Sequence, residues 1–220
     1  MVQKSTKRPR GRPKAYEPEH ALAQVTDAFW LAGFSATSLD DLSAATGMNR
    51  PSLYAAFGDK RALYLKTLEL YVERGRRGIE AALAGEGSAA DALRRVYERA
   101  LSLYLPHEAR ARGCFLIGTA ATEASSDGDV KRVLAEGLRE FDRAFEARLS
   151  RARSEGELDA RADPASLAKI ASAVLHTLAI RSRAGDSRAS LEAIAENAVV
   201  LIFGSGAKRS RAPKRRHSQG

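Results

Sequence analysis

The chain has little of what builds disulfides, metal centres or membrane spans. Only one of its 220 residues is a cysteine, Cys114, so an internal disulfide and a cysteine-rich zinc site are both excluded. Four histidines are scattered without the spacing of metal ligands: His20, His107, His176 and His217. No apolar run approaches the length that crosses a bilayer, and the polar, basic N-terminus lacks the apolar segment of a secretory signal. We therefore expect a cytoplasmic protein without metal or cofactor.

Catalytic patterns are missing as well. The sequence contains no nucleophile–base pair, phosphate-binding loop or ligand triad, so we do not expect an enzyme. Cys114 stands beside Phe115 in an apolar stretch, which is typical of a small core residue. A redox-sensing thiol is the alternative, and it would require exposure and a lowered pKa. Three further polar residues could face a ligand cavity or simply lie at helix surfaces and ends: His107, Glu123 and His176.

Acidic residues are absent from both ends of the chain. Residues 1–16 and 204–220 each carry six lysines or arginines and no acid. Removing these twelve from 36 basic residues leaves 24 against 27 acidic ones, so the basicity of the chain lies in its two ends. Such ends are typical of disordered arms that bind a polyanion, here nucleic acid. We expect them over residues 1–17 and 205–220.

The N-terminal arm contains a motif of its own. Residues 9–13, PRGRP, match the core of the AT-hook, in which Arg10 and Arg12 would enter the minor groove of A·T-rich DNA. A five-residue match is common by chance, and a plain electrostatic arm is the alternative. Both interpretations predict contact with DNA.

The stretch from Ser38 to Lys60 has the pattern of two short helices joined by a turn. Ser38 can cap the first helix, and Gly47 can end it in a left-handed conformation. Asn49 can cap the second helix, whose first turn tolerates Pro51. Two helices joined in this way form a helix-turn-helix, whose second helix enters the DNA major groove. The pattern predicts binding to double-stranded DNA.

Position within this motif assigns candidate DNA contacts. Asn49, Arg50 and Ser52 begin the second helix, the end that approaches base edges, and Arg50 suits a bidentate contact to guanine. The alternative for Arg50 is a contact to phosphate only. Side chains near two helix starts suit phosphate, since free N–H groups gather there: Thr37 and Ser38 at one and Lys60 at the other. Tyr54 lies beside the buried stripe of Leu53 and Phe57, so that its hydroxyl can reach a phosphate.

Apolar periodicity and turn residues predict about nine helices in an all-α fold. We expect helices over about 19–31, from residue 59 past residue 71, and over 89–105, 113–124 and 130–153, followed by two that begin at Pro164 and after Gly185–Ser187. Leu167, Ile170, Ala171, Val174 and Leu178 are predicted to line the inner face of the first of these two. The corresponding residues of the last helix are Leu191, Ile194, Ala198, Leu201 and Ile202.

These last two helices, at about 164–203, are unusually apolar for a chain terminus. Two antiparallel pairs across a dyad would make a four-helix bundle, and we favour a homodimer built in this way. Completion of the monomer core is the alternative.

Several phrases of the sequence resemble the tetracycline-repressor-like (TetR) transcriptional regulators. The resemblance covers roughly residues 18–70 and rests on Ala28–Phe34, Thr37–Leu39, Gly47, Ser52–Phe57, Asp59–Lys60 and Leu63. It implies a three-helix helix-turn-helix DNA-binding domain at 18–65, in which the residue matching Tyr54 contacts phosphate. It also implies an effector-binding and dimerisation domain at 66–204, with pocket residues that the sequence does not identify.

The resemblance further implies a ligand-responsive regulator. A small molecule would move the helix that begins near Lys60, change the spacing of the two recognition helices and release a palindromic operator. Repression is the commoner outcome in the family. An architectural, nucleoid-associated DNA-binding protein that relies on its basic ends is the alternative function.

Overall fold

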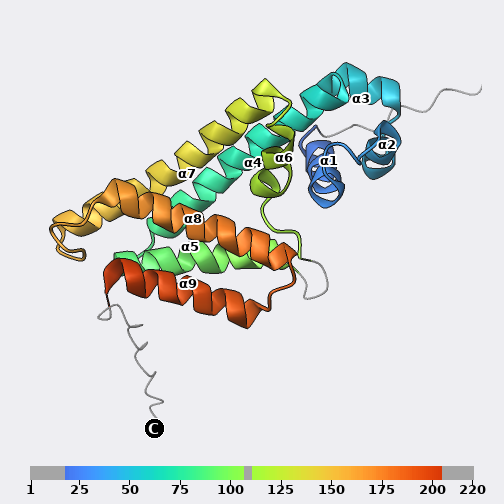
Figure 1. Cartoon of the computed structure of the whole chain (residues 1–220). Coiled ribbons are helices and arrows are strands. Elements are labelled where there is room, and N and C mark those ends of the chain that lie inside the picture. Colours follow the sequence, from blue (N-terminus) through green and yellow to red (C-terminus); the bar gives the residue numbers. More distant parts are fainter. Residues whose placement is uncertain (1–17, 107–110, 205–220) are drawn as a thin grey trace, which may run out of the picture.

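A computed structural model describes residues 18–106 and 111–204, and these are almost entirely helical (Figure 1). The expected all-α fold is confirmed, with nine α-helices and one π-helical segment in the described ranges. The α-helices are α1 (Pro18–Ala32), α2 (Leu39–Thr46), α3 (Arg50–Phe57), α4 (Lys60–Leu83), α5 (Ala89–Tyr104), α6 (Ala121–Glu123), α7 (Gly128–Ser154), α8 (Pro164–Arg183) and α9 (Arg188–Phe203). The π-helical segment is η1 (Leu116–Ala120).

The first three helices form a small unit at one end of the molecule. α1 packs on α2 and on α4, and α2 packs on α3 (Figure 1). Leu42, Leu53 and Phe57 are buried there together with Val25 and Phe29 of α1. The predicted domain boundary at residue 65 therefore falls within a continuous helix, because α4 starts in this unit and extends into the rest of the molecule.

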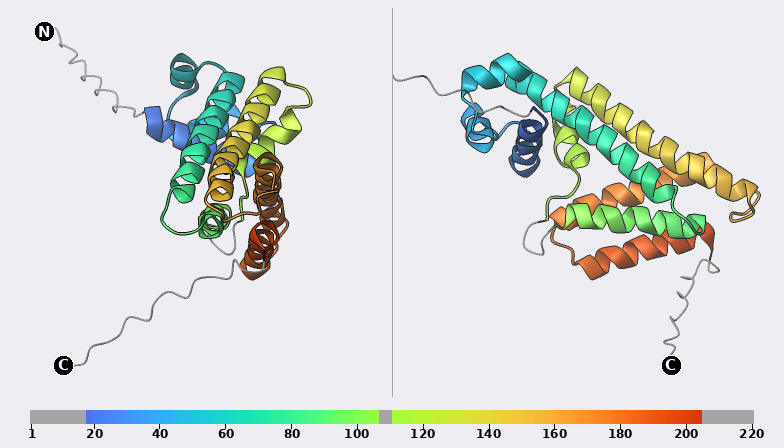
Figure 2. Two further views of the ribbon diagram at one scale, coloured as in Figure 1. Left: turned by 90° about the vertical axis from the view of Figure 1, so that its left-hand side faces the viewer. Right: turned by 180° about the vertical axis from the view of Figure 1, so that it is seen from behind.

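The remaining helices form two layers. α4 and α7 lie side by side and run in the same direction, and α5, α8 and α9 pack beneath them (Figures 1 and 2). α8 and α9 form the expected antiparallel pair. Arg61 in the first turn of α4 joins the start of α7, with Nε 2.6 Å from one Asp127 oxygen and Nη2 2.6 Å from Asp129. The hydrogen bond from Arg61 is the largest of the contacts that lower the pKa of Asp127 to about 2.

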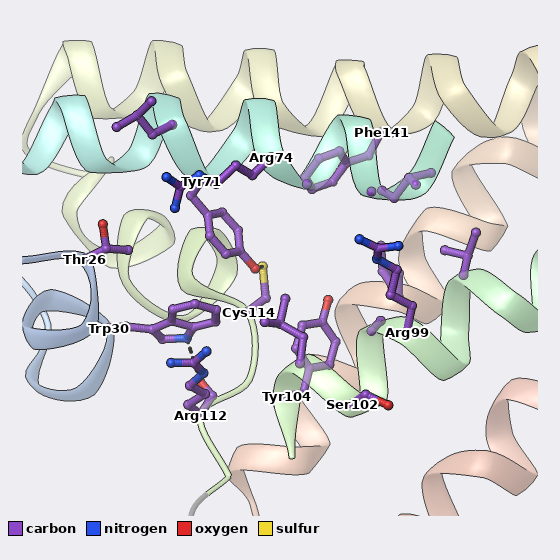
Figure 3. Close-up of a pocket in the computed structure, with 18 of the residues that line it drawn as sticks. Thr26, Trp30, Tyr71, Arg74, Arg99, Ser102, Tyr104, Arg112, Cys114 and Phe141 are labelled. Carbon is purple, nitrogen blue, oxygen red and sulfur yellow. Dashed lines mark hydrogen bonds between the residues drawn. The ribbon is translucent and has the colours of Figure 1, made fainter. Parts of the chain in front are cut away.

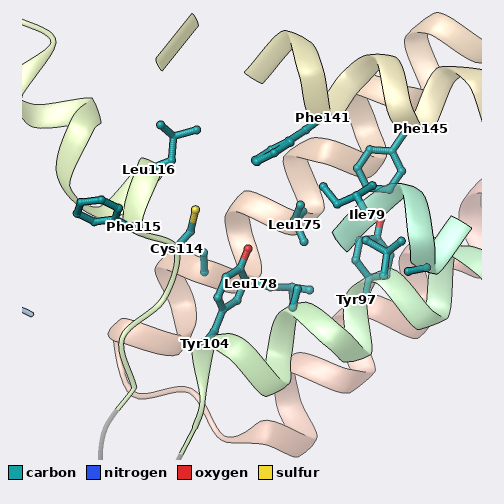
Figure 4. Packing of buried hydrophobic residues seen from close by; sticks show 14 of the residues in the cluster. Ile79, Tyr97, Tyr104, Cys114, Phe115, Leu116, Phe141, Phe145, Leu175 and Leu178 are labelled. Atoms are coloured by element: carbon teal, nitrogen blue, oxygen red, sulfur yellow. The ribbon is translucent and has the colours of Figure 1, made fainter. Parts of the chain in front are cut away.

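Aromatic side chains meet where the small unit packs on the two layers. Trp30 of α1 contacts Tyr71 of α4 edge to face, with ring centroids 5.1 Å apart, and Phe115 packs against both rings. Farther along, the core continues through Tyr97, Phe141 and Phe145 between α5, α7 and α8 (Figure 4). One aromatic cluster thus links the small unit of α1, α2 and α3 to the rest of the molecule.

α4 continues without a break to Leu83, and Gly75 admits the ring of Phe141. The helix expected over 113–124 is present over residues 115–123, and its middle, η1, is π-helical. Gly113 has a φ of +61°, and a Cβ there would lie 2.6 Å from the Ala179 carbonyl oxygen. This close contact with α8 requires a glycine just before the helix begins.

Two residues predicted to face inward lie on the surface. Ile170 of α8 is 51% exposed and Leu201 of α9 is 85% exposed. The other predictions hold in part: α8 buries the predicted Ala171 and Leu178 together with Ala168 and Leu175, and α9 buries the predicted Leu191, Ala198 and Ile202 together with Val199. Both helices are apolar on two faces, and only one of these faces packs on the monomer.

Among the described residues, no helix combines the length and apolarity that a membrane span requires.

Candidate nucleic-acid interface and an internal cavity

The capping residues shape the helix-turn-helix as predicted. The Ser38 side chain accepts from the Asp41 N–H at 3.1 Å, and the Ser38 N–H donates to the Asp41 carboxylate at 2.8 Å, forming a capping box. Hydrogen bonds from Ser38 lower the pKa of Asp41. Gly47 ends α2 at a φ of +66°, and the Asn49 side chain accepts from the Ser52 N–H at 2.9 Å. These caps fix where α3 begins and therefore which residues stand at its free end.

The residues at the start of α3 lie at the surface. Asn49, Arg50, Ser52 and Tyr54 are all exposed, while Leu53 and Phe57 on the opposite face are buried. Tyr54 is 45% exposed, as expected for a residue beside the buried stripe. α3 itself lies at the outer edge of the small unit, where it is accessible to a large partner (Figure 1).

The Arg50 guanidinium is engaged within the protein. Its Nε donates to one Asp40 oxygen at 2.8 Å, and its Nη2 donates to the other. Both side chains are more than half exposed, so this ion pair contributes little to stability and can exchange for another anion. The sequence did not indicate this pair, because α2 and α3 bring together residues ten positions apart.

The remaining phosphate candidates divide into two groups. Ser38 is exposed, and Lys60 is partly exposed with its Nζ 4.4 Å above the Phe34 ring. Thr37, in contrast, is only 2% exposed, and its hydroxyl donates to the Gly33 carbonyl at 2.6 Å. The expectation that the Thr37 side chain faces phosphate is therefore corrected to a structural role. Arg10 and Arg12 lie outside the described residues.

A cavity of about 560 Å³ opens between the small unit and the two layers. Figure 3 shows its lining, which comes from α1, α4, α5, α7, α8 and the stretch around Arg112. Most of the wall is apolar or aromatic, including Trp30, Tyr71, Tyr104 and Phe141. Its size is typical of a site for a small organic molecule. The sequence did not predict it, since six segments far apart in the chain supply the wall.

Residues of α1 are part of this wall. Thr26, Asp27 and Trp30 line the cavity, and Arg112 connects to two of them. The Trp30 indole N–H donates to the Arg112 carbonyl at 3.0 Å, while the Arg112 guanidinium lies 4.0 Å over the indole ring and 2.9 Å from Asp27. A molecule in the cavity would thus touch the helix on which the helix-turn-helix packs.

Of the polar residues that the sequence offered as possible cavity residues or redox sensors, only Cys114 is described at the cavity wall. Cys114 lines the cavity but is 3% exposed, and burial raises its pKa, which favours the neutral thiol. The Tyr71 hydroxyl donates to its sulfur at 3.2 Å. Glu123 and His176 do not line the cavity; Glu123 accepts from Ser35 at 3.1 Å. His107 lies outside the described residues. In the described ranges, no three His, Cys, Asp or Glu residues gather as metal ligands would.

Comparisons with known proteins agree with this geometry. Residues 22–67 match the model of the bacterial regulatory proteins of the tetR family, and residues 89–198 match the tetracyclin repressor-like C-terminal domain. The HTH-type transcriptional repressor ComR of Escherichia coli K12 is 31% identical over 195 residues, which cover 89% of this chain and 93% of ComR. The repressor BdcR of the same organism is 42% identical over 72 residues, covering 33% of this chain and 36% of BdcR.

Solved structures agree as well. A cysteine mutant of the TetR family regulator CifR, complexed with 26-bp operator DNA, has a TM-score of 0.78 at 29% identity. The match covers 87% of this chain and 100% of the CifR chain. Reduced NemR of E. coli shares the fold, with a TM-score of 0.76 at 21% identity over 84% of this chain and 96% of NemR. None of these comparisons supports the architectural, nucleoid-associated alternative. The chain belongs to the TetR family of DNA-binding transcriptional regulators, which are not enzymes.

Proposed function

We propose that the protein is a repressor that binds a palindromic operator as a homodimer and leaves it when a small molecule enters the cavity. The observation that carries this proposal is the position of α3. Its polar N-terminal residues are exposed at one end of the molecule, while the cavity wall includes the helix on which the motif packs. The names of ComR and BdcR support repression as the sign of regulation.

On the DNA side, Arg50 reads a base edge, and Asn49 and Ser52 contact neighbouring bases or phosphates. Tyr54, Ser38 and Lys60 position the protein on the phosphate backbone. Asp40 holds Arg50 until a guanine replaces the carboxylate. Arg10 and Arg12 in the basic arm at 1–17, together with the basic tail at 205–220, add affinity through phosphate or the minor groove.

We further propose that residues 18–65 act as the DNA-binding domain and 66–204 as the effector-binding and dimerisation domain. The exposed apolar residues of α8 and α9 support dimerisation through these helices, because the described residues of one chain leave Ile170, Ile180 and Leu201 exposed. A protein with this function would work at the nucleoid in the cytoplasm.

Replacing Arg50 and Lys60 separately tests the assignment. Arg50→Ala should remove about 1–3 kcal/mol of discrimination between operator and scrambled DNA, since a bidentate base contact is lost. Lys60→Ala should weaken both DNAs about equally, because phosphate carries no sequence information. Fluorescence anisotropy on labelled duplexes measures both effects.

Asp40→Ala is the matched control for Arg50→Ala. It breaks the same ion pair but keeps the arginine, so operator binding should be retained or strengthened. Equal weakening of operator and scrambled DNA by Arg50→Ala would contradict the base-reading role.

A further inference from the structure

We propose that the effector is an organic anion with an apolar body, bound through its anionic group by Arg74 and Arg99 with help from Arg112. This inference rests on the proposed function, since it names the class of molecule that the cavity accepts.

The first observation is the charge of the cavity wall. Its charged residues are three arginines and a single carboxylate, Asp27. Asp27 is already paired with Arg112, at 2.9 Å. No carboxylate of the described residues lies within ion-pair distance of Arg74 or Arg99. The wall therefore carries positive charge that the described protein does not neutralise.

The second observation is that other arginines of the same helices are partnered. On α4, Arg76 binds Glu73 and Glu80, and Arg77 binds Glu73. On α5, Arg94 binds Asp91 and Glu196, and Arg95 donates to three carbonyls at the end of α4. Arg74 and Arg99 differ from these four in facing the cavity instead of a carboxylate or a carbonyl.

The position of Arg99 shows how the helices accommodate it. Its guanidinium lies against α4 at Gly78, where an added Cβ would be 3.4 Å from Arg99 Nε. Figure 3 shows Arg99 rising from α5 toward α4, with Arg74 on α4 and Arg112 beneath Trp30. Arg74 and Arg99 are exposed side chains of a wall that also carries aromatic rings, and a hydrogen bond from either guanidinium to an anion is charge-assisted.

Arg112 offers a further donor. Its Nη1 donates to Asp27, but its Nε is buried and has no hydrogen-bond partner in the described part of the chain. A buried donor without an acceptor is costly, and an anionic ligand would satisfy it once the Arg112 guanidinium turns toward the cavity, because Nε itself is inaccessible in the structure. The anion would also compete with Asp27 for Arg112. It would thereby weaken the ion pair between Arg112 and Asp27 of α1.

The remaining wall selects the body of the ligand. Trp30, Tyr71, Leu103 and Phe141 present apolar surface, which favours an aromatic or aliphatic group. A cationic ligand would meet repulsion from the arginines, and a neutral one would leave them unused. A small inorganic anion would leave the apolar surface of the cavity exposed to water.

Two fluorescent probes of nearly the same shape test the charge requirement. 1-Anilinonaphthalene-8-sulfonate carries a sulfonate, and N-phenyl-1-naphthylamine is the same body without it. Trp30 is the only tryptophan of the chain and lines the cavity, so energy transfer from Trp30 reports binding at this place. The anionic probe should bind at least about tenfold more tightly than the neutral one.

Four variants of the full-length protein then locate the charge. Arg74→Gln and Arg99→Gln should each lower affinity for the anionic probe about tenfold and leave the neutral probe unchanged. Asp27→Asn should raise affinity for the anionic probe, because it removes the competing carboxylate. Arg77→Gln, on α4 but outside the cavity lining, is the control and should change neither.

Displacement of the anionic probe distinguishes two kinds of body. 1-Naphthoate displacing better than decanoate would assign an aromatic ligand, and the reverse order would assign an aliphatic one; either supports an organic anion. Displacement by neither would overturn the proposal, as would equal affinity for the two probes or no change in the two arginine variants. Operator binding is measured separately, so its failure would contradict the proposed function and leave the ligand class standing.

Discussion

At the residue scale, the capping residues were the most predictable feature. Ser38, Asn49 and Asp59 cap their helices through their own side chains, and Gly47 adopts the left-handed conformation expected of it. Each of these interactions closes within three or four residues, so the local sequence contains all the participants.

Residues whose partners come from elsewhere in the chain were not predictable. The burial of Thr37, the Arg50–Asp40 pair and the stacking of Arg112 on Trp30 all depend on how helices meet. Arg112 and Trp30 are 82 positions apart, and no local pattern connects them.

His176 provides a prediction about pH. Its Nε2 is buried without a hydrogen-bond partner among the described residues, and burial lowers its pKa, against the opposing effect of Asp142. The unfolded chain therefore binds a proton at higher pH than the folded one, and stability falls as pH drops through about 6.5. Thermal unfolding between pH 7.5 and 5.5 should show a smaller loss for His176→Leu than for the wild type. An equal or steeper loss would show that other groups set the acid dependence.

At the element scale, the sequence predicted where helices form. It predicted only in part which face of each helix is buried. α7 occupies the range expected from residue 130 and buries Val130, Phe141, Phe145 and Leu149 along one face. α8 and α9 are apolar on two faces, and periodicity cannot say which face belongs to the monomer. The helix expected over 113–124 begins at residue 115, after the close approach of Gly113 to α8, which the local sequence does not reveal.

Gly113→Ala tests that close approach. The new Cβ would collide with the Ala179 carbonyl oxygen, and alanine would also have to adopt the left-handed conformation of Gly113. We therefore expect a loss of about 2 kcal/mol or more in the free energy of unfolding. Urea denaturation measures it. Gly128→Ala is the control, because an added Cβ there meets nothing within 4 Å; it should be neutral or stabilising by up to about 1 kcal/mol. Wild-type stability in Gly113→Ala would contradict the account of this segment.

The outer face of α8 and α9 gives a prediction about assembly. Leu201→Glu places a charge on a side chain that is 85% exposed in one chain, so the monomer should fold normally. In a packed dimer interface the same charge would be desolvated without a partner, and dimers should dissociate. Sedimentation velocity measures the effect, with Ala147→Glu on the exposed side of α7 as the control. A Leu201→Glu variant as dimeric as the control would place the interface elsewhere.

At the scale of the whole molecule, the sequence and its family resemblance predicted DNA binding and release by an effector, but not where the effector would bind. The helix-turn-helix was predictable from one continuous segment. The cavity was not, because α1, α4, α5, α7 and α8 must assemble before it exists. The cavity wall includes Trp30 and Asp27 of α1, so a molecule bound there would contact the DNA-binding unit directly, and occupancy and operator affinity could be coupled without a long pathway.

In the proposed function, two copies of α3 read an inverted repeat. Hydroxyl-radical footprinting on genomic fragments enriched by the protein measures where each copy lies on the DNA. We expect two protected patches related by a dyad, with centres about one helical turn or slightly more apart, on the order of 34 Å. Uniform protection without a preferred sequence would contradict it.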